Sequence, residues 1–382
     1  MTNEKTYRFH EEVLYLTALT MWLFYFAVWI TYWKEKPFVK LVCPLLLQVS
    51  FLLLLVLFFI KRHTKKDVIG LVLTLTAGIM ADKSVYGKEL VYCMLFIWLA
   101  ADVRLEKIFQ TYLICQGFLL VITVFAAKTG IIENQNFGWE PAEQRNALGY
   151  VFATYSAHIA TFLSLLWLYI RKKSRLFDFL VCAFIILYLY NENAGKTDLL
   201  IALIGFLGFA ILRIAESRKD ESFYLIICKS MIALTIALTI SVLIIRLLYY
   251  NSPNAMGKVS DFFTDRPKYE AEAIIQYGYS LLGREIRWVG VGTQQALNNR
   301  LAYNYVDNSF LKLSLTYGIV FSSILLIAIA SLLIQLYRNL RIRELIIFCC
   351  LIIYSLYNAH LLAVHFQCII LMLSLLFADS GC

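Results

Sequence analysis

Five arginines lie in two polar stretches of a chain that is otherwise strongly apolar. A guanidinium stays charged at any working pH and can bind a phosphate through two parallel hydrogen bonds. Arginines gathered in this way predict a site for an anionic ligand such as a pyrophosphate. Acidic residues alternate with them, so solvated loop charge is the competing interpretation. The arginines are Arg145 in residues 128–149, and Arg266, Arg284, Arg287 and Arg300 in residues 249–305.

A lysine lies in a third polar stretch, residues 191–198. Gly195-Lys196-Thr197 resembles the end of a nucleotide-binding P-loop, but the upstream glycine of that motif is missing. A lysine at the start of a helix faces the unfavourable end of the helix dipole unless it serves an anion. Lys196 is therefore a further candidate for anion binding, and snorkelling of its side chain to a membrane interface is the alternative.

Asp307 and Asn308 stand directly before a long apolar segment. A carboxylate beside arginines at a membrane surface can act as a general base toward a hydroxyl group. Asp and Asn are also preferred N-cap residues, so helix capping is the alternative. We predict that Asp307 is catalytic, and that Asn308 contacts the substrate.

Histidine and cysteine do not form a recognisable metal site. His360 follows Asn358-Ala359 in an outer turn and is a weaker candidate for acid–base work or substrate binding, with simple packing as the alternative. The five histidines and nine cysteines show no zinc-ligand spacing. We therefore predict neither a metal nor a cofactor.

The composition indicates a membrane protein. The 382 residues are 60% hydrophobic and 16% charged, whereas soluble proteins average about 45–50% apolar and about 25% charged residues. The net charge of +9 does not indicate a nucleic-acid partner, because the basic residues cluster in short turns between apolar runs. Membrane lipids are the expected surroundings.

The apolar runs can be counted because a helix needs about 20 apolar residues to cross a bilayer. We predict an all-α polytopic membrane protein of about 12 transmembrane helices in a single integral membrane domain, residues 1–382. The predicted spans are residues 13–33, 38–60, 68–81, 90–102, 108–127, 150–170, 176–190, 198–214, 223–249, 308–337, 345–357 and 361–377. The alternative for the last two is one long helix, or a helix followed by a re-entrant segment.

The basic turns predict the orientation of these spans. With the N-terminus in the cytoplasm, every internal cytoplasmic turn is basic and the opposite turns are balanced, acidic or nearly uncharged. Both termini are then cytoplasmic. Residues 249–307, which we call the long outer loop, lie outside the cytoplasm together with a second outer loop, residues 128–149.

The middle of the long outer loop has a helical pattern. Over residues 273–284, five apolar side chains recur with the spacing of one helix face, although Gly278 falls on the same face. We expect an amphipathic helix here, acting as a lid on the outer membrane surface or over a central cavity.

Three short motifs, taken in order, resemble those of Wzy-like polysaccharide polymerases and the related O-antigen ligases of bacterial envelopes. The first is Arg145-Asn146-Ala147-Leu148-Gly149-Tyr150. The second is Thr264-Asp265-Arg266, followed by Leu281-Leu282-Gly283 and Gly290-Val291-Gly292. The third is Asp307-Asn308-Ser309-Phe310 with Leu315-Thr316-Tyr317-Gly318-Ile319. The similarity is good over about residues 128–335 and only architectural elsewhere.

Two positions depart from the family pattern. Lys196 stands where many members have arginine, which removes bidentate binding at that position. Asp307 stands where the ligases carry histidine, which favours the polymerase branch.

The resemblance implies a metal-independent membrane glycosyltransferase with a GT-C-like architecture in the bacterial cytoplasmic (inner) membrane. Such an enzyme polymerises undecaprenyl-diphosphate-linked oligosaccharides into capsule, exopolysaccharide or O-antigen chains, and a chain-length regulator is an expected partner. Arg145 and Arg266 would bind the diphosphate with support from Lys196, Arg284 and Arg287, and Asp307 would act as base or orienting group.

Two other functions stay open at this point. A ligase would transfer a finished glycan to a lipid, protein or wall acceptor. A lipid-oligosaccharide flippase or other transporter would place polar residues near the middle of its spans and break its helices there. The spans hold few such residues, with Lys229 and Arg246 the most conspicuous, which argues against transport.

Overall fold

A computed structural model describes residues 2–61, 63–80, 87–137, 145–218, 221–256, 265–290 and 304–378 of the chain. Within these residues the chain is mostly α-helical, and two short strands, β1 (Asn136–Phe137) and β2 (Arg145–Asn146), form an antiparallel pair. Long apolar runs become helices because a helix satisfies its own backbone hydrogen bonds in an apolar environment. The prediction of an all-α protein is confirmed.

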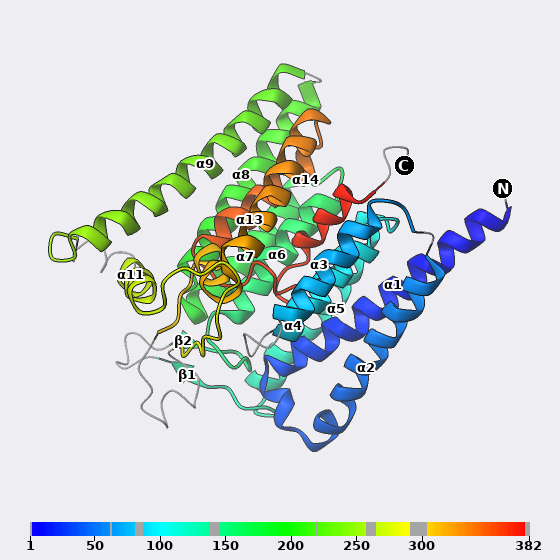
Figure 1. Cartoon of the computed structure of the whole chain (residues 1–382), viewed down its shortest axis with the longest axis horizontal. Coiled ribbons are helices and arrows are strands. Elements are labelled where there is room, and N and C mark those ends of the chain that lie inside the picture. The colour runs from blue at the N-terminus through cyan, green and yellow to red at the C-terminus, as the bar shows by residue number, and fades with distance from the viewer. Residues whose placement is uncertain are drawn as a thin grey trace. The chain divides into compact units, whose positions relative to one another are not determined.

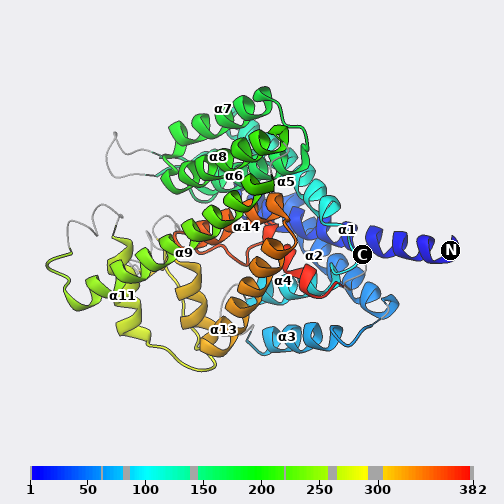
Figure 2. The same cartoon turned by 90° about the horizontal axis from the view of Figure 1, so that it is seen from above.

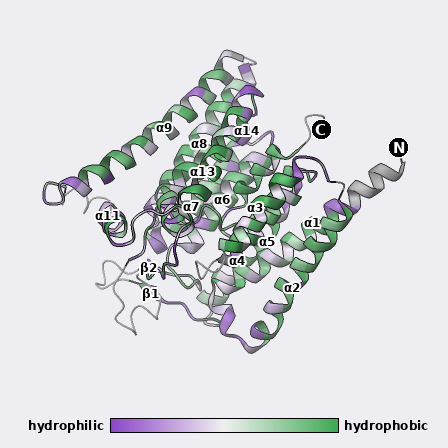
Figure 3. Ribbon diagram, viewed as in Figure 1, coloured by the Kyte–Doolittle hydropathy of each residue, from purple (hydrophilic) through white to green (hydrophobic). Residues whose placement is uncertain are grey.

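Seven of the described helices are long and apolar enough to cross a membrane. Large apolar side chains such as Phe59, Phe184 and Leu247 remain exposed along them, as expected for faces that contact lipid chains. Figure 3 shows these helices as apolar along most of their length. The seven are α1 (Thr2–Trp29), α2 (Pro37–Ile60), α5 (Leu105–Lys128), α7 (Leu176–Asn193), α8 (Lys196–Arg218), α9 (Glu221–Asn251) and α13 (Ser309–Arg338), and the shorter apolar helices are α3 (Asp67–Met80), α4 (Gly87–Leu99) and α6 (Tyr155–Ile170).

The chain divides into two compact units, and the first comprises Met1–Thr76, Val91–Phe206 and Leu362–Cys382. In this unit α1 packs along α2, to which the 3-10 helix η1 (Tyr32–Glu35) connects it, and also against α5 (Figure 1). Helix α6 packs against both α5 and α7. The core between these helices includes Leu148, Tyr150 and Ile159, which are almost fully buried.

The last predicted span, residues 361–377, does not form an α-helix. Turns occupy residues 361–368, and a 3-10 helix η4 (Ile369–Leu376) follows. The irregular backbone is tolerated because side chains satisfy it: the Tyr112 hydroxyl donates to the Phe366 carbonyl (2.5 Å), and the Gln367 side chain accepts from the Ile370 N–H (3.1 Å). Sequence hydropathy alone cannot anticipate such side-chain partners.

The second unit comprises Ala77–Leu90 and Leu207–Leu361. Here α9 packs against α14 (Ile342–Ser355) and against α11 (Arg266–Tyr277), and α13 packs against α14 (Figure 1). Helices α3, α4 and α8 contain residues of both units.

The helix of the long outer loop begins earlier than predicted. We expected it over residues 273–284, but α11 runs from Arg266 to Tyr277. Pro267 stands in its first turn, where a missing N–H costs nothing, and Gly278 ends it with a left-handed φ of 62°. The apolar side chains of α11 pack against Ile286, Val306 and the start of α13, so this face is anchored within the unit.

Helix α13 is interrupted at Gly318, which has φ 89° and ψ 168°. Across the break, the Ile319 and Val320 N–H groups donate to the carbonyls of Ser280 (3.0 Å) and Leu281 (3.2 Å). In return, the Thr316 carbonyl accepts from the Arg284 N–H (3.0 Å). The outer loop thereby supplies the hydrogen bonds that the broken helix lacks. Figure 2 shows the change of direction between the two halves of α13.

Two glycines allow this contact. Gly283 has a left-handed φ of 74°, and a Cβ on it would collide with the backbone of Thr316 and Tyr317. A Cβ on Gly318 would collide with the backbone of Gly283 and Leu281. Both glycines belong to the motifs quoted above, and the structure gives the physical reason for each: two backbones meet here with no room for a side chain.

Replacing Gly318 by Ala should destabilise the protein by about 1–3 kcal/mol from backbone strain alone, with the steric clash added. Thermal unfolding in detergent measures the effect. Gly117→Ala is the matched control, because Gly117 lies in α5 with no atom within 4 Å of an added Cβ, and this change should be neutral or stabilising by about 0.5–1 kcal/mol. Equal melting temperatures for the two variants would contradict the close backbone contact.

Candidate functional site

The ion pair between Arg266 and Asp307 lies at the end of the long outer loop. Arg266 opens α11, and its Nε donates to Asp307 Oδ2 at 3.1 Å, across 41 positions in sequence. Both side chains are about one-third exposed, at 28% and 30%. Two residues predicted to act together are therefore in direct contact, and both remain accessible.

Asn308 is the N-cap of α13. Its Oδ1 accepts from the Leu311 N–H at 3.1 Å, and the residue is buried. Helix capping was the alternative interpretation of Asp307 and Asn308. For Asn308 this interpretation is correct, because its side chain caps α13. Because Asn308 provides the cap, the Asp307 carboxylate is available to orient Arg266.

A second and more deeply buried ion pair joins α9 to α11. Arg246 Nε donates to Glu270 Oε2 at 2.6 Å, and the two side chains are only 12% and 6% exposed. Burial raises the pKa of Glu270, although the nearby Arg246 guanidinium opposes this rise. The pair fixes the position of α11 on α9.

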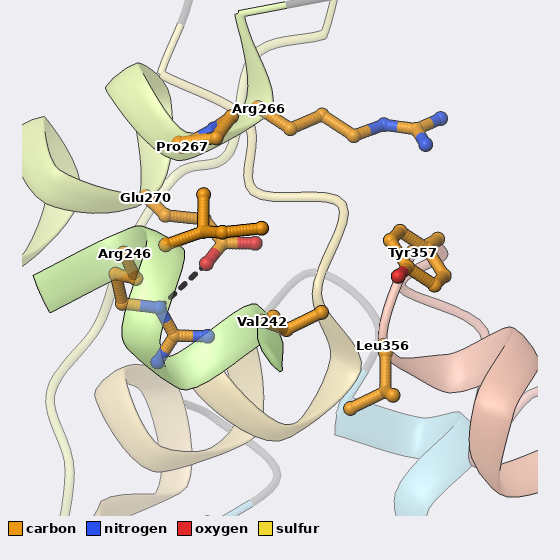
Figure 4. Close-up of a pocket in the computed structure, with 8 residues that line it drawn as sticks. Val242, Arg246, Arg266, Pro267, Glu270, Leu356 and Tyr357 are labelled. Atoms are coloured by element: carbon orange, nitrogen blue, oxygen red, sulfur yellow. Dashed lines mark hydrogen bonds and ion pairs between the residues drawn. The ribbon is translucent and has the colours of Figure 1, made fainter. Parts of the chain in front are cut away.

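A pocket lies between these charged pairs (Figure 4). Its walls combine apolar side chains with the Arg246–Glu270 ion pair, and Arg266 extends toward the side on which Tyr357 lies. The pocket therefore contains a buried ion pair among apolar side chains, and a second guanidinium lies beside it. Its lining residues are Val242, Ile245, Arg246, Arg266, Pro267, Glu270, Leu356 and Tyr357.

The other predicted residues of this unit lie on well-fixed backbone. Arg284 and Arg287 are exposed. The Arg284 N–H binds the Thr316 carbonyl, and the Arg287 carbonyl accepts from Asn304 Nδ2 at 3.1 Å. His360 is half-buried in the segment after α14. Arg300 and Thr264 lie outside the described residues.

Arg145 belongs to the first unit and is exposed in β2, where it pairs with Phe137 of β1. Asn146 Nδ2 donates to Glu192 Oε2 (2.8 Å), and Lys128 Nζ donates to the other oxygen of that carboxylate (2.6 Å). This network ties β2 to the ends of α5 and α7. Gly149, with φ 85°, then turns the chain toward α6.

Lys196 is the first residue of α8, and its side chain is exposed. Its backbone N–H donates to the Ala194 carbonyl (2.8 Å), within the turn that joins α7 to α8. An exposed cation at a helix start fits either anion binding or contact with the membrane interface.

The sequence did not identify several residues whose ion pairs and hydrogen bonds hold the site together. Glu270 had no signal beyond its charge, and Arg246 stood out only as a charge within an apolar run. Asn304 was also missed, although its side chain joins the Val289 N–H (2.6 Å), the Tyr277 hydroxyl (2.6 Å) and the Arg287 carbonyl. A buried charge in an apolar segment was the one usable signal, because such a residue needs a partner.

Among the described residues, no group of three or more His, Cys, Asp and Glu side chains could hold a metal ion. We therefore assign no metal ligands within this part of the chain.

No protein-family model matches the chain, and no curated protein matches it either.

Replacing Arg246 by Met should destabilise the protein by about 3–5 kcal/mol, because it leaves the Glu270 carboxylate buried without its cation. The double variant Arg246→Met, Glu270→Leu should regain most of this loss, since no unpaired charge remains. Thermal unfolding, together with hydrogen exchange of the α11 amides, measures both effects.

Lys172→Met serves as the control for losing an ion pair, because Lys172 and Glu106 form an exposed pair at 3.3 Å. It should change the melting temperature little. A double variant no more stable than Arg246→Met would show that the buried pair does not hold α11 in place.

Proposed function

We propose that this chain is a membrane glycosyltransferase that polymerises undecaprenyl-diphosphate-linked oligosaccharides on the outer face of the bacterial cytoplasmic membrane. The observation that carries the proposal is the Arg266–Asp307 pair, in which a carboxylate holds a partly exposed guanidinium in position. Such a guanidinium can bind a diphosphate, and the exposed apolar side chains along the helices suit the hydrocarbon chain joined to it. The proposal includes about twelve membrane spans, with both termini in the cytoplasm.

Arg266 would stabilise the diphosphate as it leaves the sugar. Charge develops on the bridging oxygen when the glycosidic bond breaks, and a fixed guanidinium lowers the free energy of that state. Asp307 holds the guanidinium through Nε, which makes it a positioning group for Arg266. Arg284 and Arg287, which belong to the same unit as Arg266, would add positive charge for this anion.

The order of the three motifs also supports this function. Gly149, Gly283 and Gly318 in these motifs all have positive φ, so each motif contains a position where the backbone needs glycine. Transfer to a different acceptor, as in a ligase, uses the same donor chemistry. The products therefore distinguish the two: a ladder of chain lengths on the lipid indicates a polymerase, and a single product on a separate acceptor indicates a ligase.

Arg266→Ala should abolish chain elongation by the purified protein with a synthetic lipid-linked repeat unit, read as a ladder on a gel. Arg266→Lys should retain only part of the activity, because lysine keeps the charge but loses the planar pair of donors. Stability should change by about 1 kcal/mol or less, since a partly exposed ion pair contributes little.

Arg104→Ala is the matched control, because Arg104 also forms an ion pair with a carboxylate, Glu12, at 3.1 Å. It should leave elongation unchanged. Full elongation by Arg266→Ala would remove Arg266 from the site and with it the main support for the proposed function.

Elongation should also continue in excess chelator. Arginine and lysine side chains can neutralise a departing diphosphate without a bound cation. The assay is the same ladder, run with and without chelator on protein washed free of divalent ions. Loss of the ladder, with recovery on adding Mg²⁺ or Mn²⁺, would contradict a metal-independent transfer.

A further inference from the structure

Lys312 is a cation in the first turn of α13, within a segment that is otherwise apolar. Its N–H donates to the Asn308 carbonyl at 2.9 Å, so its backbone is part of the regular helix. A cation at the start of a helix faces the positive end of the helix dipole, which is unfavourable unless an anion is close by. An ionisable residue in an apolar membrane segment is a functional candidate by default.

The Lys312 side chain reaches back to the segment that precedes α13. Side chains in a helix tilt toward its N-terminus, and Lys312 Nζ lies 4.1 Å from the centre of the Tyr305 ring. At this distance the ring face attracts the ammonium. Both residues are half-buried. The ring therefore holds a partly accessible positive charge at the N-terminal end of the helix.

The same short segment also binds Arg266. Arg266 comes from α11 and donates to Asp307 at 3.1 Å, whereas Lys312 comes from α13 and contacts Tyr305. The Cα atoms of two residues separated by one other are at most about 7 Å apart. Two elements of the second unit therefore bring cations to neighbouring positions on one piece of backbone.

This piece of backbone is itself held in place on both sides. Before Tyr305, the Asn304 side chain accepts from the Val289 N–H (2.6 Å) and donates to the Arg287 carbonyl (3.1 Å). After Asp307, the Asn308 side chain caps α13. Charges on a fixed scaffold stabilise an anion without having to reorganise when it binds.

Carboxylates act on the Lys312 ammonium in the absence of a ligand. They belong to Asp307 and to Glu89 of α4, which is half-buried and lies in the same unit. Asp307 is thus shared between Lys312 and Arg266. The alternative is that these charges only join the helices, as the Arg246–Glu270 pair does at 12% and 6% exposure. Lys312 and Arg266 are more accessible than that pair, which favours a ligand.

We infer that Lys312 binds the diphosphate together with Arg266, an inference that rests on the proposed function and adds a second cation to the same site. A diphosphate has two phosphoryl groups, and cations at neighbouring positions can bind both. Arg266 provides planar donors and Lys312 a compact charge with three donors. Tyr305 is the positioning residue for Lys312, as Asp307 is for Arg266.

The test measures Kd by calorimetry on the full chain in detergent, with farnesyl diphosphate, farnesyl phosphate and inorganic pyrophosphate as probes. Lys312→Met should raise the Kd for farnesyl diphosphate about tenfold or more, as expected when a charged hydrogen-bond partner is lost. Lys312→Arg keeps the charge and should stay within a few-fold. The Kd for farnesyl phosphate should rise less in Lys312→Met, because Arg266 still binds a single phosphoryl group.

Inorganic pyrophosphate separates a lipid headgroup from a free anion. It should bind more weakly than farnesyl diphosphate, with the same dependence on Lys312. Equal affinity for the two probes would overturn the lipid as the source of the diphosphate.

Lys268→Met is the matched control. Lys268 is also half-buried, lies in α11 of the same unit, and has its Nζ 5.8 Å from the centre of the Tyr269 ring. Its loss should leave the Kd within about twofold. Tyr305→Leu should raise the Kd about 2–5-fold by releasing Lys312, and Tyr305→Phe, which keeps a ring, should retain most of the affinity.

Two outcomes would overturn the role of Lys312 alone. One is an unchanged Kd in Lys312→Met while Arg266→Ala binds more weakly. The other is an equal loss of affinity for farnesyl diphosphate and farnesyl phosphate with a lower melting temperature, which would make Lys312 structural. Diphosphate binding that depends on both residues, in a chain that elongates no lipid-linked repeat unit, would instead overturn the proposed glycosyl transfer and leave the two-cation site in place.

Discussion

Polar groups that lie among apolar helices have to be paired within the protein, and much of this structure follows from that requirement. The break in α13 is the clearest case. Gly318 interrupts the helix, and the carbonyls of Ser280 and Leu281 accept the N–H groups that would otherwise have no partner. The long outer loop therefore completes the backbone hydrogen bonding of the helix that follows it. It holds its place through backbone hydrogen bonds, and only glycine at positions 283 and 318 lets the two backbones come close enough.

The same requirement applies to the charged side chains of the candidate site, which form a buried ion pair and a partly exposed ion pair. Arg246 and Glu270 are nearly inaccessible and pair with each other, which suits a structural contact between α9 and α11. Arg266 and Asp307 are about one-third exposed, which suits a guanidinium that is held in position and still reaches a ligand. Asn308 contributes to this difference, because it caps α13 and leaves the neighbouring carboxylate to Arg266.

The proposed chemistry needs positive charge in a fixed position to stabilise a departing diphosphate. Arg266 provides this charge, and its ion pair with Asp307 orients the guanidinium. In the first unit, the same need for pairing brings His158 of α6 against Asp198 of α8, and both residues are almost fully buried.

The sequence by itself determined the all-α class and most helix positions, because runs of apolar residues and the basic turns between them carry that information directly. It also singled out Arg266, Asp307 and the motif glycines, since charge in an apolar chain and glycine at a fixed position are visible in one dimension. Only the tertiary structure decided which groups meet. Glu270 pairs with Arg246 across 24 positions and Asp198 with His158 across 40, and neither spacing follows a helical repeat. The start of α11 and the irregular segment over residues 361–368 were likewise decided by contacts distant in sequence, because Ile286, Val306 and Tyr112 provide partners that local hydropathy cannot report.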